Sequence, residues 1–269
     1  MIDEKLSQRL RDSKLIIFDM DGTICLGERP FLDCVEFING LNRENKKEIL
    51  FFTNNTSKNI GYYYSKLIRM GYEVTEKQIL SSAEVTAAFL SGHREDKSVY
   101  LVGTPYLESV FKNYNIYLTD SAPDIVVSSF DTTLTYEKLE RACTYVRAGA
   151  EWLSTHPDIN CPTENGFIPD SGAINAAISA SCGGIVPRYF GKPHAETAEM
   201  ICELYGADKS EIIVVGDRIY TDIALAKNNG MVSVLVLTGE TTRDKVDAAK
   251  ECEKPDIVLN RASELSELL

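Results

Sequence analysis

Residues 14–23 read Lys-Leu-Ile-Ile-Phe-Asp-Met-Asp-Gly-Thr, an apolar run that ends in two aspartates one residue apart. The run is apolar beyond its first residue, as expected of a strand covered on both faces. Asp19 and Asp21 follow it directly, and Gly22 permits a tight turn behind them. Open α/β sheets bind their ligands beyond the carboxyl ends of the strands. This stretch therefore predicts a sheet strand that presents carboxylates to a ligand.

The same rhythm continues outward, with short β-branched runs that alternate with amphipathic ones. We predict further strands at 48–52, 99–102, 124–128, 151–155, 211–215, 233–237 and 256–259, and helices near 31–41, 64–71, 105–113, 135–149, 173–182, 196–205 and 220–228. The glycines and prolines of residues 162–172 predict a loop. The alternation predicts an α/β fold with a mostly parallel sheet.

Composition limits the class of protein. The chain has 269 residues, which exceeds one average domain, and its net charge of −12 disfavours nucleic acid and anionic lipid as partners. The sequence contains no run of 18 apolar residues, so we expect no transmembrane helix. The charged residues 1–12 contain no apolar segment typical of a signal peptide. Seven cysteines without a CxxC pair predict reduced thiols, so we expect a cytoplasmic location.

More polar groups follow the other predicted strands. Thr53 follows the strand at 48–52, Asp217 follows Gly216 at the end of the strand at 211–215, and Asp222 lies five residues further on. If these strands are neighbours, several carboxylates converge and repel one another. A divalent cation is the usual compensation, and oxygen ligands suit Mg²⁺. The pattern predicts a magnesium site.

Lys192, between Gly191 and Pro193, adds a cation that suits a dianionic phosphate. Thr53 and backbone N–H groups are candidates to bind the remaining phosphate oxygens. With phosphate bound, Asp19 becomes a candidate nucleophile, because a carboxylate attacks phosphorus to give an aspartyl-phosphate. Asp21 is then a candidate to protonate the leaving alcohol and to deprotonate the attacking water.

These residues resemble the motifs of a known family. Asp19-Met-Asp-Gly-Thr23 resembles the nucleophile motif of the haloacid-dehalogenase (HAD) superfamily of phosphatases, and three further segments look like its remaining motifs in order: Thr53-Asn54-Asn55, Gly191-Lys192-Pro193 and Gly216-Asp217 through Asp222. The chain is most similar to the NagD-like, 4-nitrophenyl-phosphatase-like branch (subclass IIA). That branch carries a large α/β cap between the second and third motifs, and the 139 positions from Thr53 to Lys192 accommodate it.

The resemblance implies a role for each matching residue. Asp19 is the nucleophile and a Mg²⁺ ligand, and Asp21 is the general acid/base and binds the metal through its backbone carbonyl. Thr53, Asn54 and Lys192 bind the phosphoryl oxygens. Asp217 is a direct metal ligand, whereas Asp222 orients either the water shell of the metal or Lys192.

It also implies an organisation and a substrate class. We expect a Rossmann-like HAD core at residues 1–81 and 188–269, interrupted by an α/β cap at 82–187. The substrate is expected to be a small phosphorylated metabolite selected by the cap. Nucleoside monophosphates, phosphoglycolate, sugar phosphates and pyridoxal phosphate all stay open. A homodimer that pairs through the cap is a further expectation.

Two departures and two alternatives remain. His156 stands where the family usually carries Asn, and residues 168–172 are less glycine-rich than usual. We interpret His156 as a hinge residue of the cap and His194 as a local structural residue, and neither as catalytic. One alternative is a non-catalytic, phosphate-binding regulatory protein on the same fold, which the presence of Asp19, Asp21 and Lys192 disfavours. The other is a phosphotransferase that uses the same nucleophile. The absence of GxGxxG after the first strand disfavours a dinucleotide binder.

Overall fold

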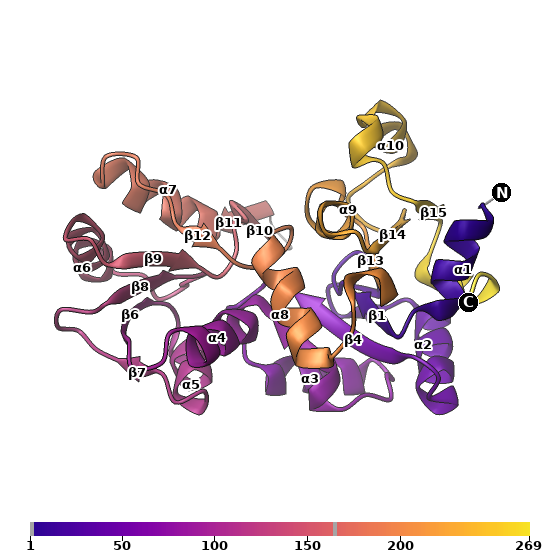
Figure 1. Cartoon of the computed structure of the whole chain (residues 1–269), viewed down its shortest axis with the longest axis horizontal. Coiled ribbons are helices and arrows are strands. Elements are labelled where there is room, and N and C mark those ends of the chain that lie inside the picture. The colour runs from indigo at the N-terminus through magenta and orange to yellow at the C-terminus, as the bar shows by residue number, and fades with distance from the viewer. Residues whose placement is uncertain (1–2, 164–165) are drawn as a thin grey trace. The chain divides into compact units, whose positions relative to one another are not determined.

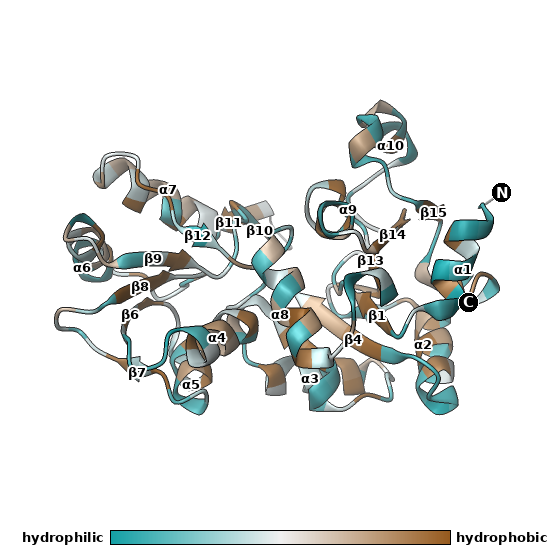
Figure 2. Cartoon of the chain, in the orientation of Figure 1, coloured by the Kyte–Doolittle hydropathy of each residue, from teal (hydrophilic) through white to brown (hydrophobic). Residues whose placement is uncertain are grey.

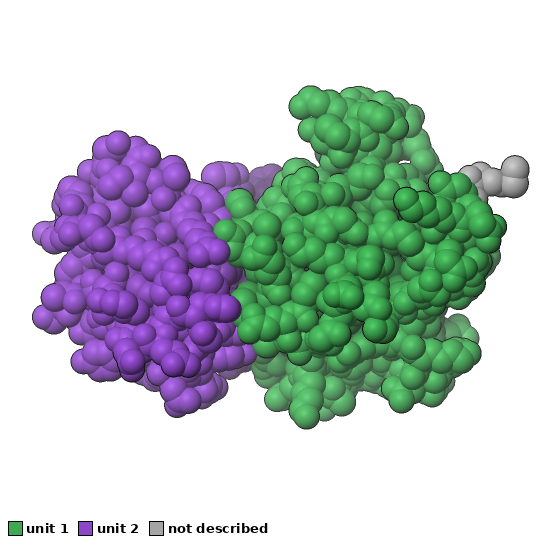
Figure 3. All heavy atoms as spheres, viewed as in Figure 1, with its two compact units in different colours: residues 1–53, 60–80, 192–269 green, residues 54–59, 81–191 purple. Residues whose placement is uncertain are grey.

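The computed structural model describes residues 3–163 and 166–269. The chain divides into two compact units, which Figure 3 distinguishes by colour. The core unit comprises Met1–Thr53, Ile60–Leu80 and Lys192–Leu269, and the inserted unit comprises Asn54–Asn59 and Ser81–Gly191. The sequence predicts an insertion at 82–187. The inserted unit of the structure extends beyond both ends of that range and also includes the short segment Asn54–Asn59.

Hydrogen bonds explain why residues 54–59 belong to the inserted unit. The hydroxyl of Ser82 donates to the backbone carbonyl of Asn54 (2.9 Å), and the hydroxyls of Thr56 and Ser129 lie 2.6 Å apart. Both pairs are buried, where an unmade hydrogen bond is costly. Two buried hydrogen bonds, at Asn54 and at Thr56, therefore join this segment to the inserted unit.

The core unit contains a parallel sheet. Its helices are α1 (Glu4–Asp12), α2 (Leu32–Glu44), α3 (Ile60–Arg69), α8 (Ala195–Tyr205), α9 (Ala224–Asn229) and α10 (Arg243–Ala248), and its strands are β1 (Leu15–Phe18), β2 (Cys25–Leu26), β3 (Arg29–Pro30), β4 (Glu48–Thr53), β5 (Ile79–Ser81), β13 (Ile212–Gly216), β14 (Val232–Val236) and β15 (Ile257–Leu259). The six-stranded sheet has the order β15-β14-β13-β1-β4-β5, and β2 and β3 form a separate hairpin. Figure 1 labels all of these helices and, of the strands, β1, β4, β13, β14 and β15.

The register of the core sheet places two predicted site segments beside each other. β1 pairs in parallel with β13 on one side, where Phe18 lies opposite Val215, and with β4 on the other, where Phe18 lies opposite Phe51. All residues of β1, β13 and β14 are buried, and the hydrophobic colour of Figure 2 concentrates on such central strands. The carboxyl ends of β13, β1 and β4 are therefore neighbours.

The inserted unit is a second α/β unit. Its helices are α4 (Ser82–His93), α5 (Pro105–Asn113), α6 (Tyr136–Arg147) and α7 (Ser171–Ser181), and its strands are β6 (Ser98–Val102), β7 (Tyr117–Leu118), β8 (Ile125–Ser128), β9 (Glu151–Ser154), β10 (Asn160–Thr163), β11 (Gly166–Pro169) and β12 (Arg188–Tyr189). Its sheet has the order β12-β9-β8-β6-β7, and every neighbouring pair is parallel.

The structure corrects the predicted loop at 162–172. β10 and β11 form an antiparallel hairpin there, and α7 already begins at Ser171. Pro162 lies opposite Phe167 in this two-stranded ribbon, in which each strand has a single partner, so a residue without an N–H is tolerated. No helix within the described ranges has the length and hydropathy needed to span a bilayer.

Candidate active site

Three carboxylates of the core unit gather beyond the carboxyl ends of β1 and β13. Asp19 directly follows β1, and its backbone N–H donates to the carbonyl of Val215 in β13 (2.9 Å). Asp217 follows β13, and Asp222 lies in a π-helical turn, Ile219–Ile223. One carboxylate oxygen of each of the three residues lies within 4.8 Å of the others. The structure thus brings together the acids that the sequence predicted at strand ends.

Lys192 reaches into this acidic cluster. Its Nζ lies 2.5 Å from Asp19 Oδ1 and 2.7 Å from Asp222 Oδ1, and it also donates to the backbone carbonyl of Phe52 (3.3 Å). The side chain is only 3% exposed. One ammonium group therefore connects the residues that follow β1 and β13 with the end of β4.

The charges in this cluster do not balance. Burial raises the pKa of Asp19 to about 7, although Lys192 opposes the shift, and Asp222 and Asp217 add to it. Burial and the charge of Asp222 raise the pKa of Asp217 to about 6. Burial works against the charge of Lys192, but Asp19 and Asp222 outweigh it and raise its pKa above the ordinary value. Three acids share one lysine, and the nearby Arg218, which also lowers the pKa of Asp217, is paired with a fourth acid, Glu240 (3.1 Å). Acids therefore still outnumber bases, and further positive charge would stabilise the site.

A hard divalent cation fits the oxygen atoms present. Oδ2 of Asp217 accepts a hydrogen bond from the backbone N–H of Glu240 (2.6 Å), whereas Oδ1 is buried without a hydrogen-bond partner in residues 3–163 and 166–269. A buried carboxylate oxygen without a donor is unfavourable unless a cation binds it. With Asp19 nearby, the donors are all oxygen, which is the set that Mg²⁺ prefers.

Glycines let the backbone approach these carboxylates closely. Gly22 has a φ of +94°, and a Cβ there would lie 2.5 Å from Asp217 Oδ2. A Cβ on Gly239 would lie 2.0 Å from the same oxygen. The hydroxyl of Thr238 donates to the carbonyl of Gly22 (2.6 Å) and so fixes the two loops to each other. No larger residue fits at either position without moving Asp217.

Asp21 lies at the exposed side of the same loop. Its side chain is 54% exposed, and its Oδ1 lies 3.4 Å from Nζ of Lys66 and 3.7 Å from Sγ of Cys25. Lys66 is not among the site residues that the sequence predicts. Lysines on amphipathic helices usually face water, so nothing in the sequence of α3 distinguishes Lys66 from a solvated lysine.

Two threonines complete the core side of the site. Thr53 is the last residue of β4, next to β1, and is buried. Thr23 is fully buried and its hydroxyl donates to Asp19 Oδ2 (3.4 Å), so it helps to orient the carboxylate. Thr23 ends the Asp-x-Asp-Gly-Thr stretch, but we predicted no role for it from the sequence.

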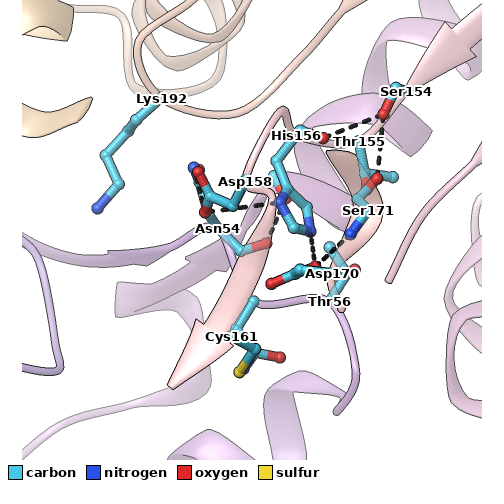
Figure 4. A network of polar contacts seen from close by, with 12 residues as sticks. Asn54, Thr56, Ser154, Thr155, His156, Asp158, Cys161, Asp170, Ser171 and Lys192 are labelled. Carbon is cyan, nitrogen blue, oxygen red and sulfur yellow. Dashed lines mark hydrogen bonds and ion pairs between the residues drawn. The ribbon is translucent and has the colours of Figure 1, made fainter. Parts of the chain in front are cut away.

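Asn54, the remaining predicted phosphate-binding residue, belongs to the inserted unit. Its amide donates to Asp158 Oδ2 (3.2 Å), as Figure 4 shows. Asp158 Oδ2 also lies 3.6 Å from Nδ1 of the fully buried His156, whose Nε2 lies 3.4 Å from Asp170 Oδ1. Burial lowers the pKa of His156, but Asp158 and Asp170 outweigh it and raise the pKa above the ordinary value. His156 therefore forms an ion-pair bridge within the inserted unit.

Known proteins match this chain over nearly all of its length. The family described as haloacid dehalogenase-like hydrolase matches residues 16–117, and the HAD-hydrolase-like family matches residues 189–265. The 5'-nucleotidase YutF of Bacillus subtilis is 31% identical over 95% of this chain and 98% of its own. The acid sugar phosphatase of Staphylococcus aureus is 34% identical over 88% of this chain and 91% of its own.

A solved structure extends the likeness to the fold. The 4-nitrophenylphosphatase of Thermotoga maritima superposes with a TM-score of 0.90 and 42% identity, over 96% of this chain and 98% of that one. The arrangement of acids and lysine beyond a parallel sheet, together with these matches, defines the class: this chain belongs to the haloacid dehalogenase-like hydrolases. Within them it is a phosphatase of the NagD-like, 4-nitrophenylphosphatase-like branch.

Proposed function

We propose that this chain catalyses Mg²⁺-dependent hydrolysis of small phosphomonoesters through an aspartyl-phosphate on Asp19. The observation that carries the proposal is the contact of Lys192 with Asp19 beyond the core sheet, beside a buried Asp217 oxygen that no described donor satisfies. A carboxylate held by an ammonium group, next to oxygen atoms that suit a divalent cation, matches the charge of a phosphate ester. Three relatives support it, which are named as a 5'-nucleotidase, an acid sugar phosphatase and a 4-nitrophenylphosphatase.

The first half of the reaction forms a bond from Asp19 to phosphorus. A carboxylate oxygen of Asp19 attacks the phosphorus atom, and the bond from phosphorus to the leaving oxygen breaks. Asp21 donates its proton to that oxygen, so that an alcohol leaves. Lys192 stays protonated and offsets the negative charge at the phosphoryl oxygens, with hydrogen bonds from Thr53 and Asn54 in the same role.

The second half regenerates Asp19. Asp21, now a carboxylate, accepts a proton from a water molecule while the oxygen of that water attacks phosphorus. The bond between phosphorus and Asp19 breaks, inorganic phosphate leaves, and Asp21 is again protonated. Atoms and charge balance over the two halves, and no redox partner is needed.

The metal has a defined place in this proposal. Asp19, Asp217 and the backbone carbonyl of Asp21 would hold Mg²⁺, while Asp222 orients Lys192, with which it forms an ion pair of 2.7 Å. When bound, the ion supplies positive charge that offsets the repulsion between Asp19 and the phosphate. The excess of acid over base described above is the reason that these residues suit it.

The inserted unit is the proposed cap, which selects the leaving group. We propose sugar phosphates and nucleoside monophosphates as the substrate class, because the relatives named above are an acid sugar phosphatase and a 5'-nucleotidase. A panel of phosphorylated metabolites, assayed for phosphate release in the presence of Mg²⁺, ranks them by kcat/KM. Uniformly low values for both groups would remove this substrate class.

Pairing of two chains through the cap also belongs to the proposal. The β10–β11 hairpin exposes Phe167 (75%) and Ile168, and Ile159, which directly precedes β10, is exposed as well. Sedimentation of the wild type and of Phe167→Ser measures the association. A monomeric wild type would contradict this part of the proposal alone.

The nucleophile is tested with Asp19→Asn. We expect this variant to fold, since the amide preserves the shape of the side chain, and to lose at least about 10³-fold in kcat, because an amide does not attack phosphorus. Phosphate release is measured with Mg²⁺, with EDTA, and after Mg²⁺ is added back. Wild-type turnover in Asp19→Asn, or full activity of the wild type in EDTA, would sink the proposed mechanism.

A further inference from the structure

A buried lysine of the core unit touches the carboxylate of Asp21. Lys66 lies on α3, its side chain is only 7% exposed, and its Nζ lies 3.4 Å from Asp21 Oδ1. Lysine is almost never buried unless it is paired, because removal of the ammonium from water is costly. Most of the length of Lys66 is enclosed while its partner is half exposed, so the lysine is held in place and the aspartate is the group that reaches solvent.

The charge of Lys66 is maintained by its surroundings. Among the described residues Lys66 forms one ion pair, with Asp21, and the thiol of Cys25 contacts the same carboxylate oxygen. Cys25 is neutral at physiological pH, because burial raises the pKa of its thiol far above the ordinary value. Glu28 forms an ion pair with Arg69 at the surface (3.4 Å). Asp21 is therefore the carboxylate that the ammonium of Lys66 contacts.

The contacts of Asp21 are one-sided. Lys66 and the thiol of Cys25 both approach Oδ1, and no hydrogen bond in the described part of the chain reaches Oδ2. When Asp21 is ionised, its Oδ1 binds the ammonium of Lys66. When Asp21 is protonated, the proton lies on Oδ2, because an ammonium group offers no acceptor for a proton on Oδ1. Oδ2 is thus the atom left to give a proton to a leaving oxygen and to take one from water.

We propose that Lys66 is the positioning residue of Asp21: it fixes Oδ1 and so directs Oδ2 as the proton-transferring atom. The inference rests on the proposed function, in which Asp21 is the general acid/base. Lys66 keeps its own three protons throughout. In the first half-reaction the proton passes from Asp21 Oδ2 to the leaving oxygen as the phosphorus–oxygen bond breaks. In the second it passes from water to Oδ2 as the new bond forms.

The leaving group provides the test. A nitrophenolate is weakly basic and leaves with little protonation, whereas the alkoxide of a sugar needs a proton in the transition state. We compare kcat/KM of the wild type, Lys66→Met and Lys66→Arg with 4-nitrophenyl phosphate and with glucose 6-phosphate. For each substrate, kcat/KM reports the steps up to formation of the aspartyl-phosphate. Lys66→Met is expected to lose about 10²-fold with the sugar phosphate and only a few-fold with the nitrophenyl ester. Lys66→Arg retains the positive charge and is expected to keep most of the wild-type kcat/KM with the sugar phosphate.

Lys47 is the matched control. It is also a partly buried lysine of the core unit, but its ammonium binds the carbonyls of Leu10, Arg11 and Ser13 at the end of α1. Lys47→Met should lower the unfolding temperature and leave the ratio between the two substrates unchanged. Lys66→Gln serves as a second variant, and thermal unfolding of every variant is recorded.

The outcomes separate this inference from the proposed function. Asp21→Asn should show the same selective loss with the sugar phosphate; an equal loss with both substrates would reject Asp21 as the acid, and with it the proposed function. If Asp21→Asn is selective and Lys66→Met loses equally with both substrates, only the role of Lys66 is overturned. Loss of the folded state in both Lys66→Met and Lys66→Gln would assign Lys66 a structural role and overturn it too.

Discussion

The two units place polar groups at the same edge of their sheets and treat them differently. Beyond β1 and β13 of the core unit, three carboxylates share one buried lysine, and one oxygen of Asp217 has no described donor. At the carboxyl ends of β8 and β9 of the inserted unit, buried hydroxyls and amides bind one another, such as Ser128 with Asn175 (2.6 Å) and Asn175 with Ser154 (2.7 Å). The charged groups that follow β9 are of opposite sign, because His156 lies between Asp158 and Asp170.

This difference distinguishes a polar cluster that is complete by itself from one that requires a bound ligand. Hydroxyls and amides satisfy each other without a ligand, and a satisfied network makes one packing arrangement rigid. Like charges that exceed their partners stabilise nothing by themselves and need a bound group. The edge of the core sheet is therefore expected to lose activity when altered, and that of the inserted sheet to lose stability.

The largest effect is expected from Lys192→Met. It leaves Asp19 and Asp222 without their shared cation, so kcat/KM should fall by about 10³-fold and the metal-free protein should lose about 3 kcal/mol of unfolding free energy. Lys138→Met is the control in the inserted unit, where Lys138 pairs with the buried Asp131 (2.7 Å). It should destabilise the protein and preserve kcat/KM. Steady-state kinetics and urea unfolding without metal measure both; comparable kinetic losses would erase the distinction between the units.

A smaller effect, and a pH dependence, is expected from His156→Gln. His156 has a pKa raised in the folded state, so its ion pairs stabilise the fold fully below the ordinary pKa of about 6.5 and lose that contribution as the pH rises through the raised value. The variant should lose about 3 kcal/mol at pH 6 and less at pH 9. Urea unfolding at both pH values measures the difference. A cost that is independent of pH would mean that His156 is uncharged in the folded protein.

The smallest effect is a difference in sign between two Asp→Asn substitutions. Asp217→Asn removes one of three mutually repelling charges, so the metal-free protein should gain up to about 1 kcal/mol, while Mg²⁺ no longer raises its unfolding temperature. Asp170→Asn keeps the bond to the backbone N–H of Ser171 but removes a charge from His156, at a cost of about 2 kcal/mol. Thermal unfolding with and without Mg²⁺ measures both. Equal signs without metal would contradict the charge imbalance of the core site.

The sequence predicted the elements whose patterns are strong. Apolar runs that end in polar residues located β1, β4 and β13, and with them Asp19, Thr53 and Asp217. It missed α4, because every residue from Ser82 to Leu90 is buried and such a helix has no polar face to set a period. It missed the β10–β11 hairpin because prolines and glycines outweigh its short apolar pattern.

Lys66 shows which kind of site residue cannot be predicted from the sequence. Three tyrosines and a serine precede it on α3, and one of them, Tyr63, is buried while Tyr62 is exposed. The inward face of such a helix depends on which groups the neighbouring loop offers, and the carboxylate of Asp21 is supplied by a segment 45 positions earlier. Periodicity within one helix carries no information about that partner.

The glycines beside Asp217 have a consequence for how this enzyme changes over generations. A single added methyl at Gly22 or Gly239 would displace a carboxylate, so these positions tolerate one amino acid. The position of the Asp217 carboxylate thus depends on the lack of a side chain at these two glycines. Mutations that survive selection and change the substrate preference must therefore accumulate at other positions. A scan of all substitutions should show that only glycine supports activity at positions 22 and 239.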